Sequence, residues 1–328
     1  MLDQLARYSA KIGSDPEQVQ AGGGNTSLKD GNTLWVKASG FWLADAETRD
    51  LFVPVDLAKA VDAIDDGDEA DIRSAVIAEH NPDALRPSIE TSLHALLPHR
   101  FVIHTHSVRT IAIAIRADAE ARFADRLDGL SWAFVPYVFP GLPLTRAIRD
   151  AIGSRPVDII VMGNHGLVVA GDDLDATAAL IEKVERRLDA PARALGMVQQ
   201  PPAREGLRPV RHRAAHTLAT DARLRDMAVA GSYYPDHVIF LGPAAATPET
   251  AKPGQQLILV PGEGFVTSMS SIRRLAGTVK DRYHGAAQLQ FVFSSQWSTP
   301  DRFAVVEQFG AELEPLLRVI LDKSDEAE

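Results

Sequence analysis

The sequence predicts an α/β fold in which helices pack around a sheet. Two observations lead to this expectation. Apolar, partly β-branched runs such as 101–105 indicate buried strands. Other segments, such as 2–13, carry apolar residues at helical spacing. Because the two kinds of segment alternate along most of the chain, we expect layers of helices on a sheet.

The first helix is expected over 2–13, where Gly13 ends it. Ser88, which follows Pro87, is a plausible N-cap of a later helix that carries Glu90 in its first turn. The remaining elements of this half are expected as follows: strands at 34–39 and 51–56, helices at 55–64 and 72–78, a strand at 101–105, a helix at 108–117, strands at 132–139, 157–162 and 167–171, and a long helix over 173–195.

A change of composition to Pro, Gln and Gly over 197–207 predicts a linker. We therefore divide the chain into a first domain, 1–198, and a C-terminal α/β extension, 199–328. No G-x-G-x-x-G motif follows a strand, so no dinucleotide-binding domain is expected. In the extension we expect strands at 236–240, 256–260 and 288–293, a helix near 271–283 and a long C-terminal helix.

Two segments of the chain share one layout. Residues 260–274 repeat the pattern of 162–176, with Glu263 in the place of His165. The pattern is that of a degenerate repeat or of two independent strand–turn–strand units.

Composition and charge restrict the class of partner. No apolar run approaches the roughly 20 residues that span a bilayer, and residues 1–11 lack the apolar core of a secretory signal. The absence of cysteine excludes disulfides and thiolate metal sites and fits the cytoplasm. The net charge of −10 argues against nonspecific nucleic-acid binding, because an acidic surface repels phosphate backbones. We expect a cytoplasmic protein that acts on a small molecule and has neither a nucleic acid nor a membrane as partner.

Three histidines form a candidate metal site. His104 and His106 stand two residues apart at the end of a predicted strand, so their side chains project to the same face. Two buried histidines with satisfied ring nitrogens would give the same pattern. A third candidate, His165, lies between Gly163 and Gly166 in a tight turn between two predicted strands. Catalytic zinc usually has three protein ligands and one open position, so the three imidazoles predict Zn²⁺ or another divalent transition metal.

A glycine-rich segment, 21–25, precedes the strand expected at 34–39. Its backbone N–H groups can form an anion cradle, although a flexible turn has the same composition. Lys37, further along, is a candidate for Schiff-base chemistry or for a structural role. Nothing around it in the sequence suggests a depressed pKa, so we expect the structural role.

Several motifs together resemble the class II aldolase/adducin superfamily. The residues that carry the resemblance are GSDPEQVQAGGGNTSLK (13–29), LWVKASG (34–40), PSIETSLHALLP (87–98), HTHS (104–107) and GNHGLVVAG (163–171). Within the superfamily, the chain looks most like the aldolase part of the bacterial rhamnulose-1-phosphate aldolase/dehydrogenase fusions. The dehydrogenase half of those fusions has no counterpart here.

The resemblance implies a three-layer α/β/α sandwich on a mainly antiparallel sheet, usually in symmetric homo-oligomers. It implies that Glu90 is the catalytic acid/base and that His104, His106 and His165 bind the metal. It places the phosphate of a sugar phosphate in a site made of residues that match the family's: Gly24, Asn25, Ser39, Gly40 and Ser88. The implied reaction is cleavage of a ketose 1-phosphate of the rhamnulose or fuculose type to dihydroxyacetone phosphate and an aldehyde, through a metal-stabilised enediolate.

The sequence departs from the family at two places, and other functions remain open. Gly22 and Ile89 stand where hydroxyl side chains would serve a phosphate site, so a carboxylate or an unphosphorylated sugar is an alternative substrate. The superfamily also contains decarboxylases and 4-epimerases with related chemistry. Two other possibilities are a non-catalytic binding subunit, as in adducins, and a subunit that docks a separate dehydrogenase.

Overall fold

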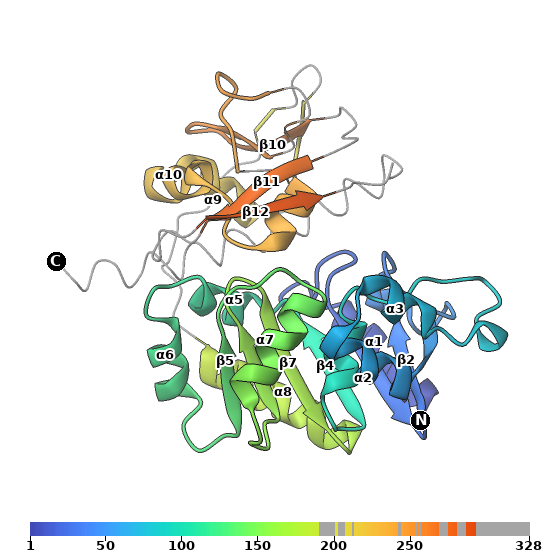
Figure 1. Ribbon diagram of the computed structural model, residues 1–328. Coiled ribbons are helices and arrows are strands. Elements are labelled where there is room, and N and C mark those ends of the chain that lie inside the picture. The colour runs from blue at the N-terminus through green and yellow to red at the C-terminus, as the bar shows by residue number, and fades with distance from the viewer. Residues whose placement is uncertain are drawn as a thin grey trace. The chain divides into compact units, whose positions relative to one another are not determined.

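The computed structural model describes residues 1–189, 201–202, 207–211, 213–241, 244–252, 255, 257–268, 275–280 and 287–292 (Figure 1). The chain divides into two compact units. The first takes Met1–Thr110 and Glu120–Leu188, and the second takes Ile111–Ala119 together with the described residues from Asp189 onward.

A seven-stranded sheet forms the centre of the first unit, in the order β3-β2-β1-β4-β7-β6-β5. Neighbouring strands run antiparallel, except that β5 and β6 are parallel. The strands are β1 (Asn25–Asp30), β2 (Thr33–Lys37), β3 (Phe52–Asp56), β4 (Phe101–Thr105), β5 (Trp132–Val135), β6 (Ile159–Met162) and β7 (Gly166–Gly171).

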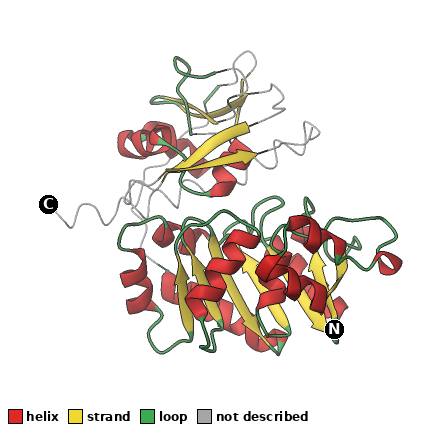
Figure 2. Cartoon of the chain, in the orientation of Figure 1, coloured by secondary structure: helices red, strands yellow, loops and turns green. Residues whose placement is uncertain are grey.

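Helices cover both faces of this sheet, as Figures 1 and 2 show. Helices α2, α4 and α7 contact one another on one face, while α1 contacts β1 and α8 contacts β7. The three-layer sandwich on a mainly antiparallel sheet is thus confirmed. The helices associated with this unit are α1 (Leu2–Gly13), α2 (Leu57–Asp66), α3 (Glu69–Ser74), α4 (Thr91–Leu96), α5 (Val108–Ala114), α6 (Ala119–Arg126), α7 (Leu142–Ile152) and α8 (Leu174–Leu188).

Strand β4 lies in the middle of the sheet and is buried along its whole length. Its residues alternate between two apolar clusters. Phe101 packs with residues of α1, and Val102 packs with residues of α4 and α7. Since alternate residues share a face, His104 lies on the same side of the strand as Val102. The two layers of helices therefore bury β4 along its length.

Local capping interactions set several boundaries that the sequence pattern misses. Helix α2 begins one residue after Asp56, whose side chain accepts a hydrogen bond from the Lys59 amide. Asp68 and Asp71 form a capping box, so α3 begins at Glu69. The helix ends at Ser74, whereas we expected a helix over 72–78. The N-cap of α4 is Glu90, so the prediction of Ser88 as N-cap is wrong.

The second unit contains a three-stranded sheet in the order β8-β10-β9 and a separate pair, β11 and β12. Its described helices are short, which agrees with an α/β extension. The elements are η3 (Arg213–His216), α9 (Thr217–Thr220), α10 (Ala222–Ala230), η4 (His237–Leu241), β8 (Leu207–Pro209), β9 (Leu257–Val260), β10 (Gly264–Ser268), β11 (Leu275–Lys280) and β12 (Ala287–Val292).

Two predictions for this unit are wrong. The strand expected at 236–240 is a π-helical turn, because a short apolar run alone does not distinguish a strand from a buried helical segment. The segment near 271–283, expected to be a helix, contains strand β11, where Thr278 and Val279 favour extended backbone and Gly277 disfavours helix. The expected strands at 256–260 and 288–293 are present as β9 and β12.

Other expectations for the C-terminal half lie largely outside the described residues. They are the linker over 197–207, the domain boundary at 198, the end of the helix expected to reach 195 and the long C-terminal helix. The last described turn of α8 ends at Leu188.

The turns β6–β7 and β9–β10 share one backbone conformation. Asn164 and Gly262 have φ of 55° and 77°, and Gly166 and Gly264 have φ of 156° and 155°. In both turns the amide of the third residue, His165 or Glu263, donates to the carbonyl three residues earlier. The layout noted in the sequence is therefore a real structural correspondence between two strand–turn–strand units.

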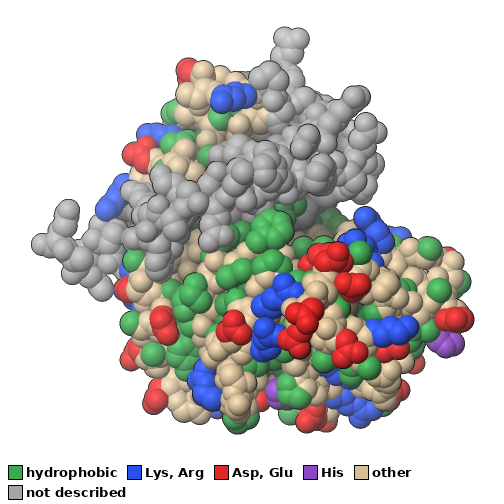
Figure 3. All heavy atoms as spheres, in the orientation of Figure 1, with side chains coloured by type: hydrophobic (Ala, Val, Ile, Leu, Met, Phe, Trp, Pro, Cys, Tyr) green, Lys and Arg blue, Asp and Glu red, His purple; other side chains and the backbone are tan. Residues whose placement is uncertain are grey.

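None of the helices in the described part of the chain is both long enough and apolar enough to cross a bilayer. On the visible face of the first unit, acidic and basic side chains are interspersed (Figure 3).

Candidate metal centre and acid–base site

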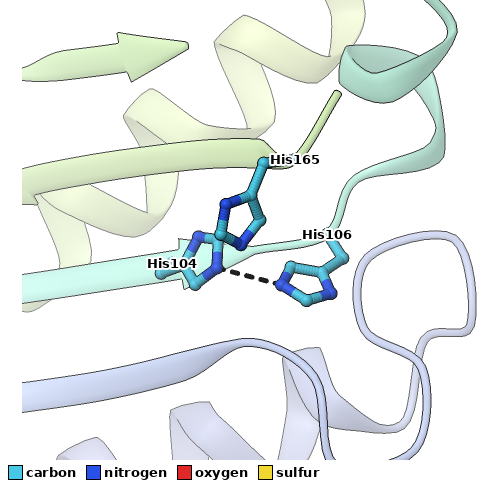
Figure 4. Close-up of side chains that lie close together, drawn as sticks. All are labelled: His104, His106 and His165. Atoms are coloured by element: carbon cyan, nitrogen blue, oxygen red, sulfur yellow. Dashed lines mark hydrogen bonds between the residues drawn. The ribbon is translucent and has the colours of Figure 1, made fainter. Parts of the chain in front are cut away.

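Three imidazoles converge where the end of β4 meets the β6–β7 turn (Figure 4). His104 belongs to β4, His106 follows the end of that strand, and His165 lies in the turn. Their candidate ligand atoms all lie within 4.8 Å of one another, and the Nε2 atoms of His104 and His106 are 3.0 Å apart. All three side chains are buried. The structure therefore brings together the three histidines that the sequence predicts as metal ligands.

The backbone of the β6–β7 turn explains why His165 reaches β4. Strands β4 and β7 pair antiparallel, with Thr105 opposite Leu167. A Cβ atom on Gly166 would lie 2.3 Å from the carbonyl oxygen of Thr105, so only glycine allows this approach. Asn164, with φ of 55°, adopts the left-handed conformation that asparagine tolerates better than most residues. The tight turn thus packs His165 directly against the end of β4.

The surroundings of the imidazoles fit a bound cation. The Nδ1 of His104 lies 3.0 Å from the carbonyl oxygen of Leu167, which can only accept, so Nδ1 carries a proton and Nε2 is the ring nitrogen that faces the cluster. Burial lowers the pKa of His165 to about 3, which keeps that ring neutral and able to coordinate. The Oε1 atom of Glu90 is buried without a hydrogen-bond partner. Three imidazoles beside one carboxylate form a donor set that suits Zn²⁺.

Glu90 lies directly on the histidine cluster. Its Oε2 atom is 3.3 Å from Nε2 of His104, and its Oε1 atom is 3.3 Å from Nε2 of His165. Burial raises the pKa of Glu90, but the charge interaction with His104 and the hydrogen bond from Asn25 outweigh it and lower that pKa to about 2. The side chain is therefore a carboxylate at neutral pH, and it is in place to exchange a proton with a ligand bound at the cluster.

The residues proposed for anion binding also lie together. The amide of Ser39 donates to Arg86 O (2.8 Å) and the amide of Ser88 donates to Lys37 O (3.0 Å), which joins the end of β2 to the segment before α4. A Cβ on Gly22 would lie 3.8 Å from Cα of Gly40, so the glycine loop packs beside that join.

Asn25 completes this group. Its Nδ2 atom donates to Oγ of Ser88 at 3.1 Å and to Oε2 of Glu90 at 2.8 Å. Gly24, with φ of 60°, precedes it and approaches the His104 carbonyl so closely that a Cβ would lie 3.0 Å from that oxygen. The candidate anion loop and the histidine cluster are therefore adjacent.

The sequence analysis missed the place of Lys37. This side chain is only 2% exposed, and its Nζ donates to the carbonyl oxygen of Gly22 at 2.9 Å. A buried ammonium beside the glycine loop adds positive charge where an anion would bind. The sequence shows only a lysine near the end of a strand. Its contact with Gly22 becomes visible only in the folded structure, where the glycine loop lies beside β2.

His94, on helix α4, has a partner at each of its ring nitrogens. Nδ1 lies 2.7 Å from Oγ of Ser27, and Nε2 contacts Oδ1 of Asn25. Tyr137 follows β5, and the Gly163 turn packs against its backbone. Burial raises the pKa of Tyr137 to about 12, so its hydroxyl is protonated at neutral pH.

Comparisons with known proteins find similarity in the first part of the chain. Residues 3–190 match the family model described as Class II Aldolase and Adducin N-terminal domain. A curated relative from Bacillus subtilis (strain 168), the uncharacterized oxidoreductase YuxG, is 32% identical over 207 residues. That match covers 57% of this chain and 30% of the relative, so this chain spans less than a third of the relative's length.

Two solved structures are also similar over 57% of this chain. The N-terminal class II aldolase domain of a conserved protein from Thermoplasma acidophilum is 28% identical, with a TM-score of 0.49 and 93% of its own chain covered. An L-fuculose-1-phosphate aldolase from Thermus thermophilus is 16% identical, with a TM-score of 0.40 and 93% of its chain covered.

Proposed function

This chain belongs to the class II aldolase and adducin family, and from that premise we propose that it is a metal-dependent carbon–carbon lyase. Its proposed substrate is a ketose 1-phosphate of the rhamnulose or fuculose type, and its products are dihydroxyacetone phosphate and an aldehyde. The observation that carries the proposal is the position of Glu90, whose two carboxylate oxygens each lie 3.3 Å from a histidine of the cluster.

We propose that His104, His106 and His165 hold the metal, with Zn²⁺ as the first candidate. A divalent metal there would act as a Lewis acid toward the ketose oxygens. The role of the chain is to present three imidazole nitrogens from the end of a buried strand and from a tight turn. The same burial excludes water from the charge that develops during bond cleavage, which strengthens electrostatic stabilisation of that charge.

Glu90 is the proposed acid/base. In the direction of synthesis, it removes a proton from the carbon of dihydroxyacetone phosphate that attacks the aldehyde. In the direction of cleavage, the hydroxyl that becomes the aldehyde oxygen gives up a proton, Glu90 takes up a proton, and Glu90 then delivers it to the same carbon after the carbon–carbon bond has broken. A lowered pKa of about 2 keeps Glu90 ionised at the start of the synthesis direction, as a base requires.

The proposed phosphate site is formed by Gly24, Asn25, Ser39, Gly40 and Ser88. The Ser88 hydroxyl oxygen accepts hydrogen bonds from Asn25 and from the Glu90 amide, which leaves its proton for an anion. Lys37 supplies a positive charge beside the loop and offsets the missing hydroxyls at Gly22 and Ile89. This support favours a phosphorylated substrate over a neutral sugar.

The oxidoreductase name of the curated relative does not lead us to propose redox chemistry for this chain. The match covers 30% of that protein, and we assign any redox activity to the part that this chain does not span. We also propose that the chain forms a homo-oligomer and that it can associate with a separate dehydrogenase.

The test is release of dihydroxyacetone phosphate from rhamnulose 1-phosphate and fuculose 1-phosphate, with added zinc and with EDTA. We expect release that EDTA abolishes and zinc restores. Carbon dioxide release from a sugar-acid phosphate, or inversion at carbon 4 without cleavage, would replace the lyase with a decarboxylase or an epimerase. Metal-loaded protein that is inactive in all three assays would overturn the proposal.

A further inference from the structure

A continuous chain of buried polar contacts runs from β1 to Glu90 through His94. The Oγ atom of Ser27 lies 2.7 Å from Nδ1 of His94, and Nε2 of His94 contacts Oδ1 of Asn25. Asn25 then donates from Nδ2 to Glu90 at 2.8 Å and to Ser88 at 3.1 Å. All of these side chains are buried, and that of His94 has no exposed surface.

The acceptor role of Glu90 determines which group donates and which accepts in each hydrogen bond between Ser27, His94, Asn25 and Glu90. The Nδ2 atom of Asn25 donates to Oε2 of Glu90 and to Oγ of Ser88, so the NH₂ group of this amide faces both acceptors. The carbonyl oxygen of that amide then faces His94, which requires a proton on Nε2 of the ring. Burial lowers the pKa of His94 to about 3, so the ring is neutral at pH 7 and its Nδ1 accepts from the hydroxyl of Ser27.

Without a donor at the position of His94, the Asn25 carbonyl would be buried and unsatisfied. A buried polar group that lacks a partner favours rearrangement of its side chain. Rotation of Asn25 would break its bonds to Glu90 and to Ser88 together, since one NH₂ group makes both. His94 is the described residue that contacts Asn25 Oδ1 and prevents this rotation.

We infer that His94 is a positioning residue that orients Asn25, and through it both the acid/base Glu90 and the anion-binding hydroxyl of Ser88. This inference rests on the proposed function, because it assigns those two roles to Glu90 and Ser88. It goes beyond a packing role, since packing needs neither a particular ring tautomer nor a donor at Nε2.

Three variants of the full-length, metal-loaded protein distinguish a positioning role of His94 from a packing role. His94→Gln keeps a donor and an acceptor on one side chain, whereas His94→Leu keeps the bulk and removes both. Ser92→Ala is the matched control, because Ser92 lies on the same helix and makes a buried 2.8 Å hydrogen bond to Thr145 that does not involve Glu90. Thermal unfolding of each variant reports the purely structural cost.

The first measurement needs no substrate. Nitrogen-15 NMR of selectively labelled protein is expected to show His94 protonated on Nε2 alone at pH 7. It should also show Asn25 side-chain amide protons that exchange slowly with solvent in wild type and in His94→Gln, and rapidly in His94→Leu. Protonation on Nδ1 in wild type, or unchanged amide protection in His94→Leu, would overturn the inference.

The second measurement is steady-state kinetics of the cleavage reaction. Partners of catalytic or metal-bound groups typically contribute 10–100-fold, so kcat in His94→Leu should fall by about that factor. His94→Gln should stay within about fivefold of wild type, and Ser92→Ala within about twofold even where its Tm falls. Equal loss of kcat in His94→Leu and Ser92→Ala, or no rescue by glutamine, would assign His94 to structure alone.

The two measurements also separate this inference from the proposed lyase function. If no ketose 1-phosphate is cleaved but the NMR results hold, the substrate assignment fails and the orientation of Asn25 by His94 stands. If cleavage occurs and the NMR results fail, the function stands and the inference does not.

Discussion

Asn25 and His104 are paired residues in the antiparallel register of β1 and β4. This pairing places the end of the glycine loop next to the first histidine of the cluster. The side chain of Asn25 and that of His104 both reach Glu90, at 2.8 Å and 3.3 Å. The anion loop, the acid/base and the candidate metal site are therefore connected through a single pair of strands, which leads to the following predictions.

Glu90→Gln should leave metal binding largely intact and remove most of the activity. Glutamine keeps the size of the side chain but cannot accept a proton, and general acid–base groups typically contribute 10²–10⁴-fold. We expect kcat to fall by about that range at near-stoichiometric zinc. The exposed Glu79, as Glu79→Gln, is the control. Unchanged kcat in Glu90→Gln would show that another group moves the proton.

Gly166→Ala should destabilise the protein and weaken metal binding. The added Cβ would lie 2.3 Å from the Thr105 carbonyl, at a φ of 156°. We expect a loss of more than about 2 kcal/mol in the free energy of unfolding. The control is Gly153→Ala, which has φ of 54° and open space around the new Cβ and should lose only about 1 kcal/mol. Similar losses in the two variants, measured by urea unfolding, would count against the close approach of turn and strand.

Lys37→Met should weaken binding of the phosphate group. Hydrogen bonds to charged groups contribute about 1.5–3 kcal/mol, so the KM for a ketose 1-phosphate should rise by roughly tenfold or more. The inhibition constant of inorganic phosphate should rise in parallel. Lys59→Met, at an exposed lysine, controls for the change in net charge. A KM that stays constant in Lys37→Met would place the anion elsewhere.

The stability of the metal-free protein should fall in acid partly because of His94. Burial lowers its folded-state pKa to about 3, against an ordinary value of 6.5, so between these values the unfolded chain binds the extra proton. The stabilisation is complete above pH 6.5 and is lost as the pH falls toward 3. Between pH 7 and pH 5, wild type should lose about 2 kcal/mol more than His94→Gln. Parallel urea-unfolding curves for the two proteins would contradict a neutral, buried His94.

Much of the fold of the first unit follows from local pattern. Strand β4 is a continuous apolar run, so its burial and the common direction of His104 and His106 are readable from residue type and parity. Gly163 and Gly166 mark the turn that carries His165 in the same way. These features depend on neighbours in sequence, which is why pattern reasoning recovers them.

The rest of the site depends on contacts between distant segments. The bond from Lys37 to Gly22 and the path from His94 through Asn25 to Glu90 join residues from separate elements, and no spacing rule encodes them. The π-helical turn at His237–Leu241 has the same limitation, since its apolar run suits a strand or a helix until its neighbours are known. The N-cap at Glu90 was missed because Ser88, two residues earlier, has the more common capping side chain.

The most direct test of the central claim is bound zinc, measured by elemental analysis, together with dihydroxyacetone phosphate release in His104→Ala and His99→Ala. His99 is a matched histidine outside the cluster, where it contacts Asp158 at 3.2 Å. We expect wild type and His99→Ala to bind about one zinc per chain and to cleave the ketose 1-phosphate, while His104→Ala loses both properties. Full zinc occupancy in His104→Ala would contradict the assignment of the three histidines as the metal site.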